Sequence, residues 1–193
     1  LTHSRGKTQM LQHVLESALR QTMNRLVRPV LNPAVPVPLQ RRIVRQAYRS
    51  STPPRGAKFE NITIGGVPAT RTTFGNDPRG AVLYLHGGGY IIGSSSTHRG
   101  ITGHLAKTTG CAIVTPDYRL APEFPFPAAL DDAEACWNGL LEAGLKPDQI
   151  AVAGDSAGGG LSVALAMRLR DKGLQLPASL TAFSPWIDLT QEQ

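Results

Sequence analysis

A serine lies in a sequence pattern that is typical of an enzymatic nucleophile. Ser156 is the central residue of the pentapeptide "GDSAG" at 154–158, which fits the pattern G-x-S-x-G. The apolar run 149–155 predicts a strand before it, and residues 157–172 predict a helix after it. A serine at such a sharp turn takes a strained backbone conformation, so its neighbours must be small. The pattern therefore predicts a nucleophile elbow rather than a tight turn of purely structural use.

A glycine-rich loop supplies a second set of groups for the same chemistry. The residues "HGGGY" at 86–90 follow the apolar run "AVLYL", which predicts a buried strand. Glycine lets a backbone approach a ligand closely, and its N–H groups can stabilise the oxyanion formed during acyl transfer. A phosphate-binding loop is the alternative, but neither G-x-G-x-x-G nor a Walker lysine is present. We expect His86 to hold this loop through its ring nitrogens rather than to act as a base.

Short apolar strands that alternate with helices must position these two motifs. The runs 57–64 and 67–74, separated by two glycines, predict a hairpin. Further strands are expected within 80–89, 111–118, 149–155 and 178–184, and helices over 98–109, 126–144 and 157–172. This alternation predicts a mostly parallel sheet with helices on both faces.

The first 50 residues differ in composition from the rest of the chain. Residues 7–28 and 38–49 have the spacing of amphipathic helices, joined by a proline-rich stretch that predicts an extended linker starting at Pro29. This segment carries nine Lys or Arg residues and one acid. These charges lie on the polar faces of the helical patterns without aromatic residues between them, so we expect solvated faces rather than a nucleic-acid or anionic-membrane partner.

The overall composition narrows the class of protein further. The 193 residues suffice for one domain with a small appendage, and no apolar run is long enough for membrane insertion. We expect Cys111 and Cys136 to be buried free thiols, which favours a reducing, cytoplasmic location. No His/Cys cluster has metal-ligand spacing, so neither a metal nor another cofactor is expected.

Four sequence blocks together resemble a known family. They are "HGGGY" at 86–90, "DYRLAPEFPFPAALDD" at 117–132, "GDSAGGG" at 154–160 and "SPWIDLT" at 184–190. In this order they are similar to the hormone-sensitive-lipase-like (family IV) esterases of the α/β-hydrolase superfamily. The resemblance implies an N-terminal helical cap over 1–50 and an α/β-hydrolase core over 51–193 whose last strands are missing from the sequence.

The resemblance also implies roles for individual residues. It implies that Ser156 is the nucleophile, that the oxyanion is held by the N–H groups of Gly88, Gly89 and Ala157, and that the supporting residues are His86, Gly87, Tyr90 and Asp155. Arg119 is expected to be buried, with acceptors among Glu123, Asp131 and Asp132. Trp186 and Asp188 are expected to brace the elbow rather than to take part in the reaction.

The base that Ser156 needs is missing from the expected part of the sequence. A serine hydroxyl requires an adjacent base, most often a histidine, which follows the serine in the chain order of this fold. All five histidines, at 3, 13, 86, 98 and 104, precede Ser156. Asp188 is a weak candidate for the acid. We expect a fragment of a longer esterase; a partner chain with the remaining segment and a short protein without catalysis are the alternatives.

These features together predict a serine carboxylesterase that acts on a small-molecule ester, with short acyl chains favoured by the resemblance only. Two rivals stay open: a non-catalytic ligand-binding protein on the same scaffold, and an amidase or peptidase with the same serine machinery. A homodimer and a second chain that carries the C-terminal segment are the candidate protein partners.

Overall fold

The computed structural model describes residues 17, 21, 25, 28–30, 32–48 and 51–188. The chain divides into two compact units, Leu1–Ile43 and Val44–Gln193. The first contains the short helix α2 (Arg28–Val30) and most of α3 (Val37–Ala47), which confirms the second predicted amphipathic helix. The helix predicted over 7–28 lies almost wholly outside the described residues.

The proline-rich segment before α3 is not the extended linker that its prolines predicted. Arg28–Val30 is helical, and residues 33 and 34 form a turn. The Asn32 side chain accepts a hydrogen bond from the Ala34 amide at 2.9 Å, and its carbonyl accepts one from the Val35 amide at 2.9 Å. An asparagine side chain can replace a backbone acceptor in this way, and it therefore stabilises a turn where the prolines alone predict extension.

Six strands form one sheet in the second unit. Their bounds are β1 Ala57–Ile64, β2 Val67–Phe74, β3 Ala81–Leu85, β4 Ala112–Pro116, β5 Ile150–Asp155 and β6 Ser179–Phe183. The strand order is β1-β2-β4-β3-β5-β6. Strand β2 is antiparallel to both of its neighbours, whereas β4, β3, β5 and β6 run parallel to one another. The predicted hairpin and the mostly parallel sheet are therefore both confirmed.

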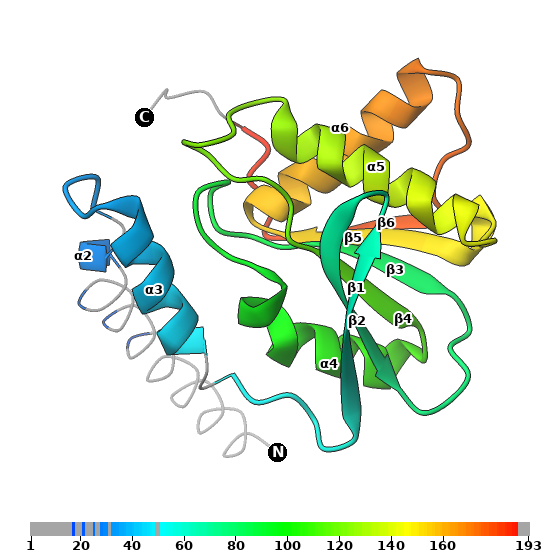
Figure 1. Cartoon of the computed structure of the whole chain (residues 1–193), viewed down its shortest axis with the longest axis horizontal. Coiled ribbons are helices and arrows are strands. Elements are labelled where there is room, and N and C mark those ends of the chain that lie inside the picture. Colours follow the sequence, from blue (N-terminus) through cyan, green and yellow to red (C-terminus); the bar gives the residue numbers. More distant parts are fainter. Residues whose placement is uncertain are drawn as a thin grey trace, which may run out of the picture. The chain divides into compact units, whose positions relative to one another are not determined.

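Helices cover both faces of this sheet, as the alternating pattern predicted. Helix α4 (Arg99–Thr109), which follows the 3-10 turn η3 (Ser95–His98), lies on one face. Helices α5 (Ala128–Glu142) and α6 (Ala157–Asp171) lie on the other, and a second 3-10 turn, η4 (Pro147–Gln149), leads into β5. Figure 1 shows these layers, with the sheet between α4 and the α5–α6 pair.

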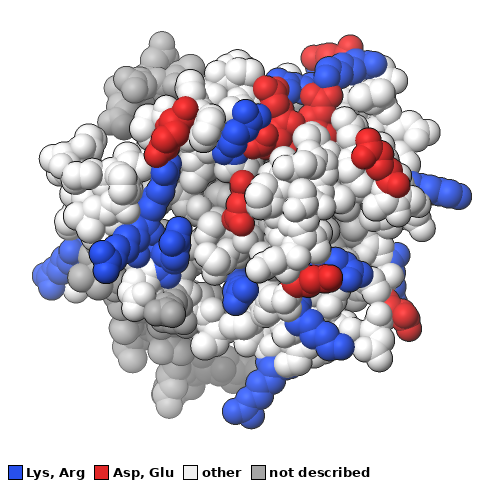
Figure 2. Space-filling view, in the orientation of Figure 1, with Lys and Arg blue, Asp and Glu red and all other residues white. Residues whose placement is uncertain are grey.

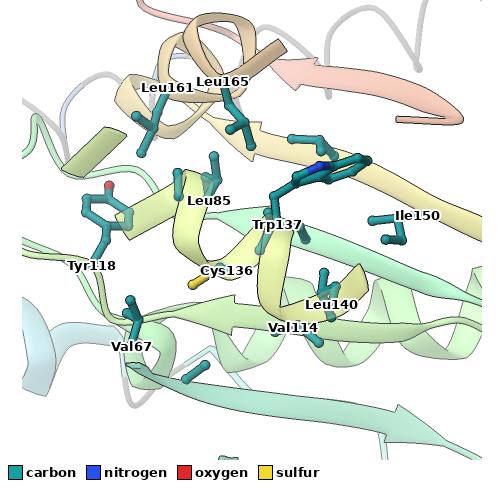
Figure 3. Close-up of a cluster of buried hydrophobic side chains, with 14 of the residues drawn as sticks. Val67, Leu85, Val114, Tyr118, Cys136, Trp137, Leu140, Ile150, Leu161 and Leu165 are labelled. Carbon is teal, nitrogen blue, oxygen red and sulfur yellow. The ribbon is translucent and has the colours of Figure 1, made fainter. Parts of the chain in front are cut away.

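The larger of two apolar cores lies between the sheet and the α5–α6 pair. It contains Leu85, Val114, Trp137 and Leu165, all essentially removed from solvent (Figure 3). A smaller core on the α4 face contains Tyr84 and Ile113 among others. Alternate residues of the central strands point to opposite faces, so strands buried on both sides are apolar throughout, which is why they were recognisable in the sequence.

Helices α5 and α6 are also joined by charged side chains at their surface. The Arg168 guanidinium lies 2.6 Å from an oxygen of Asp131 and 3.3 Å from one of Glu134. Lys172 pairs with the same Glu134. Figure 2 shows acidic and basic side chains interspersed at the top of the view, where α5 and α6 lie. Ion pairs at a protein surface contribute little to stability, typically below about 1 kcal/mol each.

The cysteines agree only in part with the sequence prediction. Both are free, and Cys136 is buried, where its thiol lies 3.6 Å from the Ile64 carbonyl. Cys111 is only half-buried; it lies between Gly110, which caps the C-terminus of α4, and the first residue of β4. Within the described residues, no helix has the length and apolar character needed to cross a membrane.

Candidate active site

The elbow around Ser156 has the backbone strain that its sequence predicted. Strand β5 ends at Asp155 and α6 begins at Ala157, with Ser156 between them at φ 51° and ψ −121°. A Cβ atom on Gly154 would lie 2.3 Å from the Gly158 carbonyl oxygen, and one on Gly158 would lie 2.0 Å from the Leu85 oxygen. Only glycine fits at either position. The turn leaves Ser156 exposed at the carboxyl end of β5.

Backbone hydrogen bonds hold this elbow from the β6 side. The Ser156 amide donates to the Phe183 carbonyl, and the Trp186 amide donates to the Ser156 carbonyl, both at 2.9 Å. Trp186 therefore braces the elbow, as its sequence block predicted. The first amides of α6, from Ala157 onward, have no acceptor within the helix and carry its partial positive charge. This helix end is suited to stabilise negative charge beside Ser156.

The glycine loop begins directly after β3 and takes conformations that favour glycine. Gly88 has φ 125°, Gly89 has φ 61° and Tyr90 has φ 60°. The Gly88 carbonyl accepts hydrogen bonds from the Ile91 and Ile92 amides at 3.1 and 3.0 Å, which folds the loop back on itself. A Cβ atom on Gly88 would lie 2.2 Å from the Ile92 oxygen, whereas one on Gly89 would meet nothing within 4 Å. Gly89 therefore borders open space.

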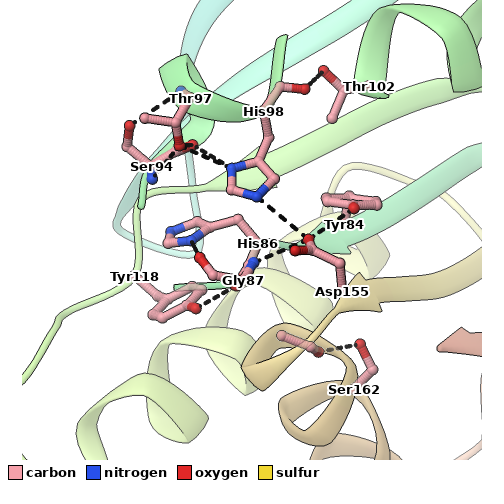
Figure 4. Close-up of polar contacts among 11 residues, drawn as sticks. Tyr84, His86, Gly87, Ser94, Thr97, His98, Thr102, Tyr118, Asp155 and Ser162 are labelled. Carbon is pink, nitrogen blue, oxygen red and sulfur yellow. Dashed lines mark hydrogen bonds and ion pairs between the residues drawn. The ribbon is translucent and has the colours of Figure 1, made fainter. Parts of the chain in front are cut away.

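Asp155 joins the loop to the elbow (Figure 4). Its Oδ1 atom accepts a hydrogen bond from the Gly87 amide at 3.0 Å and one from the Tyr84 hydroxyl at 2.8 Å. The His98 Nε2 atom lies 3.4 Å from the same oxygen. A Cβ atom on Gly87 would lie only 2.2 Å from Asp155 Oδ2, so glycine is required for this approach. The residue next to Ser156 thus holds the glycine loop directly.

The surroundings of Asp155 keep its carboxyl group ionised. Burial alone would raise the pKa of this group, because a carboxylate is poorly solvated there. The hydrogen bonds from His98, Tyr84 and the Gly87 amide favour the charged form and outweigh that effect, so the pKa lies below its ordinary value of 3.8. The carboxylate is therefore available as an acceptor near neutral pH.

His86 is fully buried behind the loop and forms no hydrogen bond to Ser156. Its ring stacks on Tyr118 at 4.2 Å between centroids, and the Tyr118 hydroxyl donates to the His86 carbonyl at 2.6 Å. Burial, followed by the nearby His98, lowers the pKa of His86 to about 4, so the ring is neutral at pH 7. Its Nδ1 atom lies 2.9 Å from the Gly87 oxygen.

One detail of the prediction for His86 is wrong. The sequence led us to expect that His86 holds the glycine loop through its ring nitrogens, but only Nδ1 contacts the loop. Nε2 is buried and has no hydrogen-bond partner among the described residues. The ring faces Tyr118 on one side and His98, 5.4 Å away between centroids, which leaves only one nitrogen directed at the loop.

Sequence reasoning did not select His98 as a site residue. His98 is the last residue of η3, where Ser94 and Thr97 form a capping box. Only 6% of His98 is exposed to solvent. The serine and threonine before it are a recognisable turn signal. Its partner Asp155 is far away in the sequence, however, and only the packing of η3 against the end of β5 brings the two side chains together.

The prediction for Arg119 is wrong about its burial, but Asp132 is one of the acceptors that it named. Its side chain is 46% exposed, not buried, and it forms an ion pair with Asp132 at 2.7 Å. Asp132 also accepts a hydrogen bond from the Arg119 amide at 2.8 Å, whereas Asp131 pairs with Arg168. Asp131 and Asp132 are consecutive on α5 and point in different directions, so only one of them can face Arg119.

An apolar cavity of about 520 Å³ lies beside the elbow helix. Its lining residues include Tyr90 from the glycine loop, Trp186 from the segment after β6, and Gly160 and Leu161 from α6. The centroids of the Tyr90 and Trp186 rings lie 6.4 Å apart. The described residues contain no group of His, Cys, Asp or Glu side chains that could hold a metal ion.

Comparison with known proteins agrees with this architecture. Residues 82–193 match the family model described as the alpha/beta hydrolase fold. The chain is 44% identical over 131 residues to an acetyl-hydrolase of Streptomyces hygroscopicus, covering 68% of this chain and 44% of that protein. It is 38% identical over 176 residues to the esterase LipU of Mycobacterium tuberculosis, covering 86% of this chain and 58% of the relative. The chain thus spans about half the length of these relatives.

Solved structures give the same result. A crystal structure of an esterase from the bacterial hormone-sensitive lipase family superimposes with a TM-score of 0.78 at 43% identity, covering 82% of this chain and 54% of that one. A mutant of the esterase E40 superimposes with a TM-score of 0.80 at 40% identity, covering 88% of this chain and 58% of that one. The chain belongs to the α/β-hydrolase family, in its hormone-sensitive-lipase-like (family IV) esterase branch.

Proposed function

We propose that this protein is a serine carboxylesterase that hydrolyses small-molecule esters through an acyl-enzyme on Ser156. The observation that carries this proposal is the position of Ser156. It is exposed in a strained conformation at the N-terminus of α6, next to an aspartate that binds the glycine loop. This arrangement brings together a nucleophile and a set of backbone N–H groups, which acyl transfer requires.

In the proposed reaction, the Ser156 Oγ atom attacks the ester carbonyl carbon while a base takes its proton. The carbonyl oxygen becomes an oxyanion, which the amides of Gly88, Gly89 and Ala157 stabilise. Collapse of this intermediate breaks the bond to the alcohol, which leaves with the proton from the base. Water then attacks the acyl-enzyme in the same way and releases the carboxylic acid. His86, Gly87, Tyr90 and Asp155 shape and hold this site.

The base in this proposal is a histidine outside the described residues. No side chain of the described residues forms a hydrogen bond to Ser156 Oγ. His86 is unsuitable because its ring is buried and stacked on Tyr118, and its Nδ1 atom is directed at the Gly87 carbonyl. A base must lie within hydrogen-bond reach of the proton that it accepts, directly or through one water.

We further propose that the substrates have short acyl chains and that residues 1–50 form a cap over the core at 51–193. The name of the Streptomyces relative, an acetyl-hydrolase, supports the first point. The amphipathic helical patterns of the first 50 residues support the second. A cap excludes water from the site and shapes the substrate pocket.

A Ser156→Ala variant tests the proposed function in the natural polypeptide that contains this sequence. We expect p-nitrophenyl acetate hydrolysis to fall by about 10³-fold or more, because the nucleophile is removed. A fluorophosphonate probe should label the wild-type protein at Ser156, as located by peptide mass spectrometry. Ser179→Ala, which removes an exposed serine of β6, is the matched control and should keep both properties. Labelling at another residue would contradict the assignment.

A homodimer, a second chain that carries a C-terminal segment, and a cytoplasmic location remain predictions from the sequence. Size-exclusion chromatography with light scattering of the natural polypeptide measures its oligomeric state. A monomer at all concentrations would contradict the homodimer.

A further inference from the structure

His98 has no role in the reaction proposed above, yet its ring contacts the site at one oxygen of the Asp155 carboxylate. Three donors converge on Asp155 Oδ1: the Tyr84 hydroxyl, the Gly87 amide and the His98 ring. An ionised carboxylate can only accept hydrogen bonds, so it pairs with His98 when the Nε2 atom, 3.4 Å from Oδ1, carries a hydrogen. His98 is therefore a donor to the residue that links the elbow to the glycine loop.

The orientation of the His98 ring is held from its other side. Its Nδ1 atom lies 2.9 Å from the Thr97 hydroxyl oxygen and 3.1 Å from the Ser94 carbonyl oxygen. The centroids of the Tyr48 and His86 rings lie 5.7 and 5.4 Å from the centroid of the His98 ring. These contacts leave the ring little freedom, so Nε2 points steadily at Asp155. Figure 4 shows the ring between the η3 turn and the Asp155 carboxylate.

This contact matters because Asp155 is attached to both halves of the candidate site. Its backbone directly precedes Ser156, and its carboxylate binds the amide that opens the glycine loop. A shift of the carboxylate would move the loop relative to the nucleophile. Because oxyanion stabilisation depends on donors placed about 3 Å from the developing charge, small displacements lower the rate.

We propose that His98 is a positioning residue, which holds the Asp155 carboxylate against the Gly87 amide and so sets the distance between Ser156 and the oxyanion donors of the glycine loop. This inference rests on the proposed esterase function. The competing explanation is that His98 only stabilises the fold through its buried contacts, including those to Ser94 and Thr97.

Two amide substitutions separate these explanations in the natural polypeptide that contains this sequence. The side-chain amide of His98→Gln extends about as far as Nε2 and can donate to Asp155. The shorter amide of His98→Asn matches Nδ1 and can keep the contacts with Ser94 and Thr97. With p-nitrophenyl acetate, we expect His98→Asn to lower kcat about tenfold with little change in KM, and His98→Gln to retain most of the kcat.

A control variant and a second measurement keep the test decisive. Thr102→Val removes a buried hydroxyl that donates to the His98 carbonyl at 3.0 Å, and it should leave kcat unchanged even if the melting temperature falls. Hydrogen exchange followed by mass spectrometry should show faster exchange at residues 86–90 in His98→Asn than in His98→Gln. This measurement needs no activity.

The possible results distinguish the two proposals. Equal kcat in both His98 variants, or a larger loss in His98→Gln than in His98→Asn, would overturn the positioning role, as would unchanged exchange at residues 86–90. If the wild-type protein shows no hydrolysis that depends on Ser156, the esterase proposal fails instead. The exchange experiment then still shows whether His98 holds the glycine loop.

Discussion

At the scale of single residues, burial decides what each of the three described histidines can do. His86 follows β3 directly and is enclosed by the sheet, Tyr118 and His98, so its ring stays neutral. His98 is almost as deeply buried but faces a carboxylate. His104 lies on the exposed side of α4. The residue type is the same in all three cases, so the differences come from the environment. His86 supports the glycine loop, His98 contacts Asp155, and His104 faces solvent.

Neutral burial of His86 predicts that acid destabilises the protein. Its pKa is about 4 in the folded state and about 6.5 when unfolded, so the unfolded chain binds more protons between these values. The free energy of unfolding should therefore fall as the pH drops from about 6.5 to 4, by about 3 kcal/mol from this group. The pKa of Asp155 lies below 3.8, so its contribution is lost only at lower pH.

Urea unfolding at pH 7, 5 and 4 measures this effect. In His86→Gln, which cannot titrate, the loss of stability between pH 7 and 4 should be smaller than in the wild type. His104→Gln removes an exposed histidine from α4 and should keep the wild-type pH dependence. Identical pH dependence in all three proteins would show that His86 is not buried in its neutral form.

At the scale of secondary-structure elements, the site depends on how closely helices approach strands. Glycines make this approach possible in both helices on one face of the sheet. On α6, Gly158 lies against the Leu85 carbonyl, and on α5, Gly139 lies against the β1–β2 turn. A Cβ atom on Gly139 would lie 2.4 Å from the Gly65 amide nitrogen. Helix α5 is therefore packed directly on the hairpin.

Because of this contact, we expect Gly139→Ala to destabilise the protein, although helix propensity alone would make the substitution stabilising. Alanine in place of glycine normally stabilises a helix interior by about 1 kcal/mol. Here the added methyl group meets backbone atoms of the turn, so we expect a net loss of about 1–3 kcal/mol in the free energy of unfolding. The exposed neighbour Asn138 is the control, because Asn138→Ala should be neutral or slightly stabilising. Stabilisation by Gly139→Ala in urea unfolding would contradict the contact.

At the scale of the whole molecule, residues 44–193 form a unit of their own. They contain the sheet, both apolar cores, the elbow and the glycine loop. Strand β6 is the last strand in the order and pairs only with β5 among the described residues. Leu180 and Phe183 of this strand, together with Trp186 and Ile187 after it, are exposed apolar side chains. An open edge of this kind can pair with further strands.

Removal of residues 1–43 from the natural polypeptide tests the division into units. We expect the melting temperature to change by only a few degrees, because the cores lie within residues 44–193. If residues 1–50 form the proposed cap, the KM for p-nitrophenyl esters should change several-fold, since a cap acts on substrate access. Loss of cooperative unfolding in the shortened protein, seen by calorimetry, would show that the first unit is required for folding.

Local patterns in the sequence determined most of the secondary structure and the candidate nucleophile. The hairpin strands at 57–64 and 67–74, the strand and helix around Ser156 and the glycine loop depend on neighbours in the chain. Periodicity and small residues report these neighbours directly. The tertiary structure alone decided the strand order, the exposure of Arg119 and the meeting of His98 with Asp155. Those features depend on contacts between elements far apart in sequence, which only the packing of the helices on the sheet brings together.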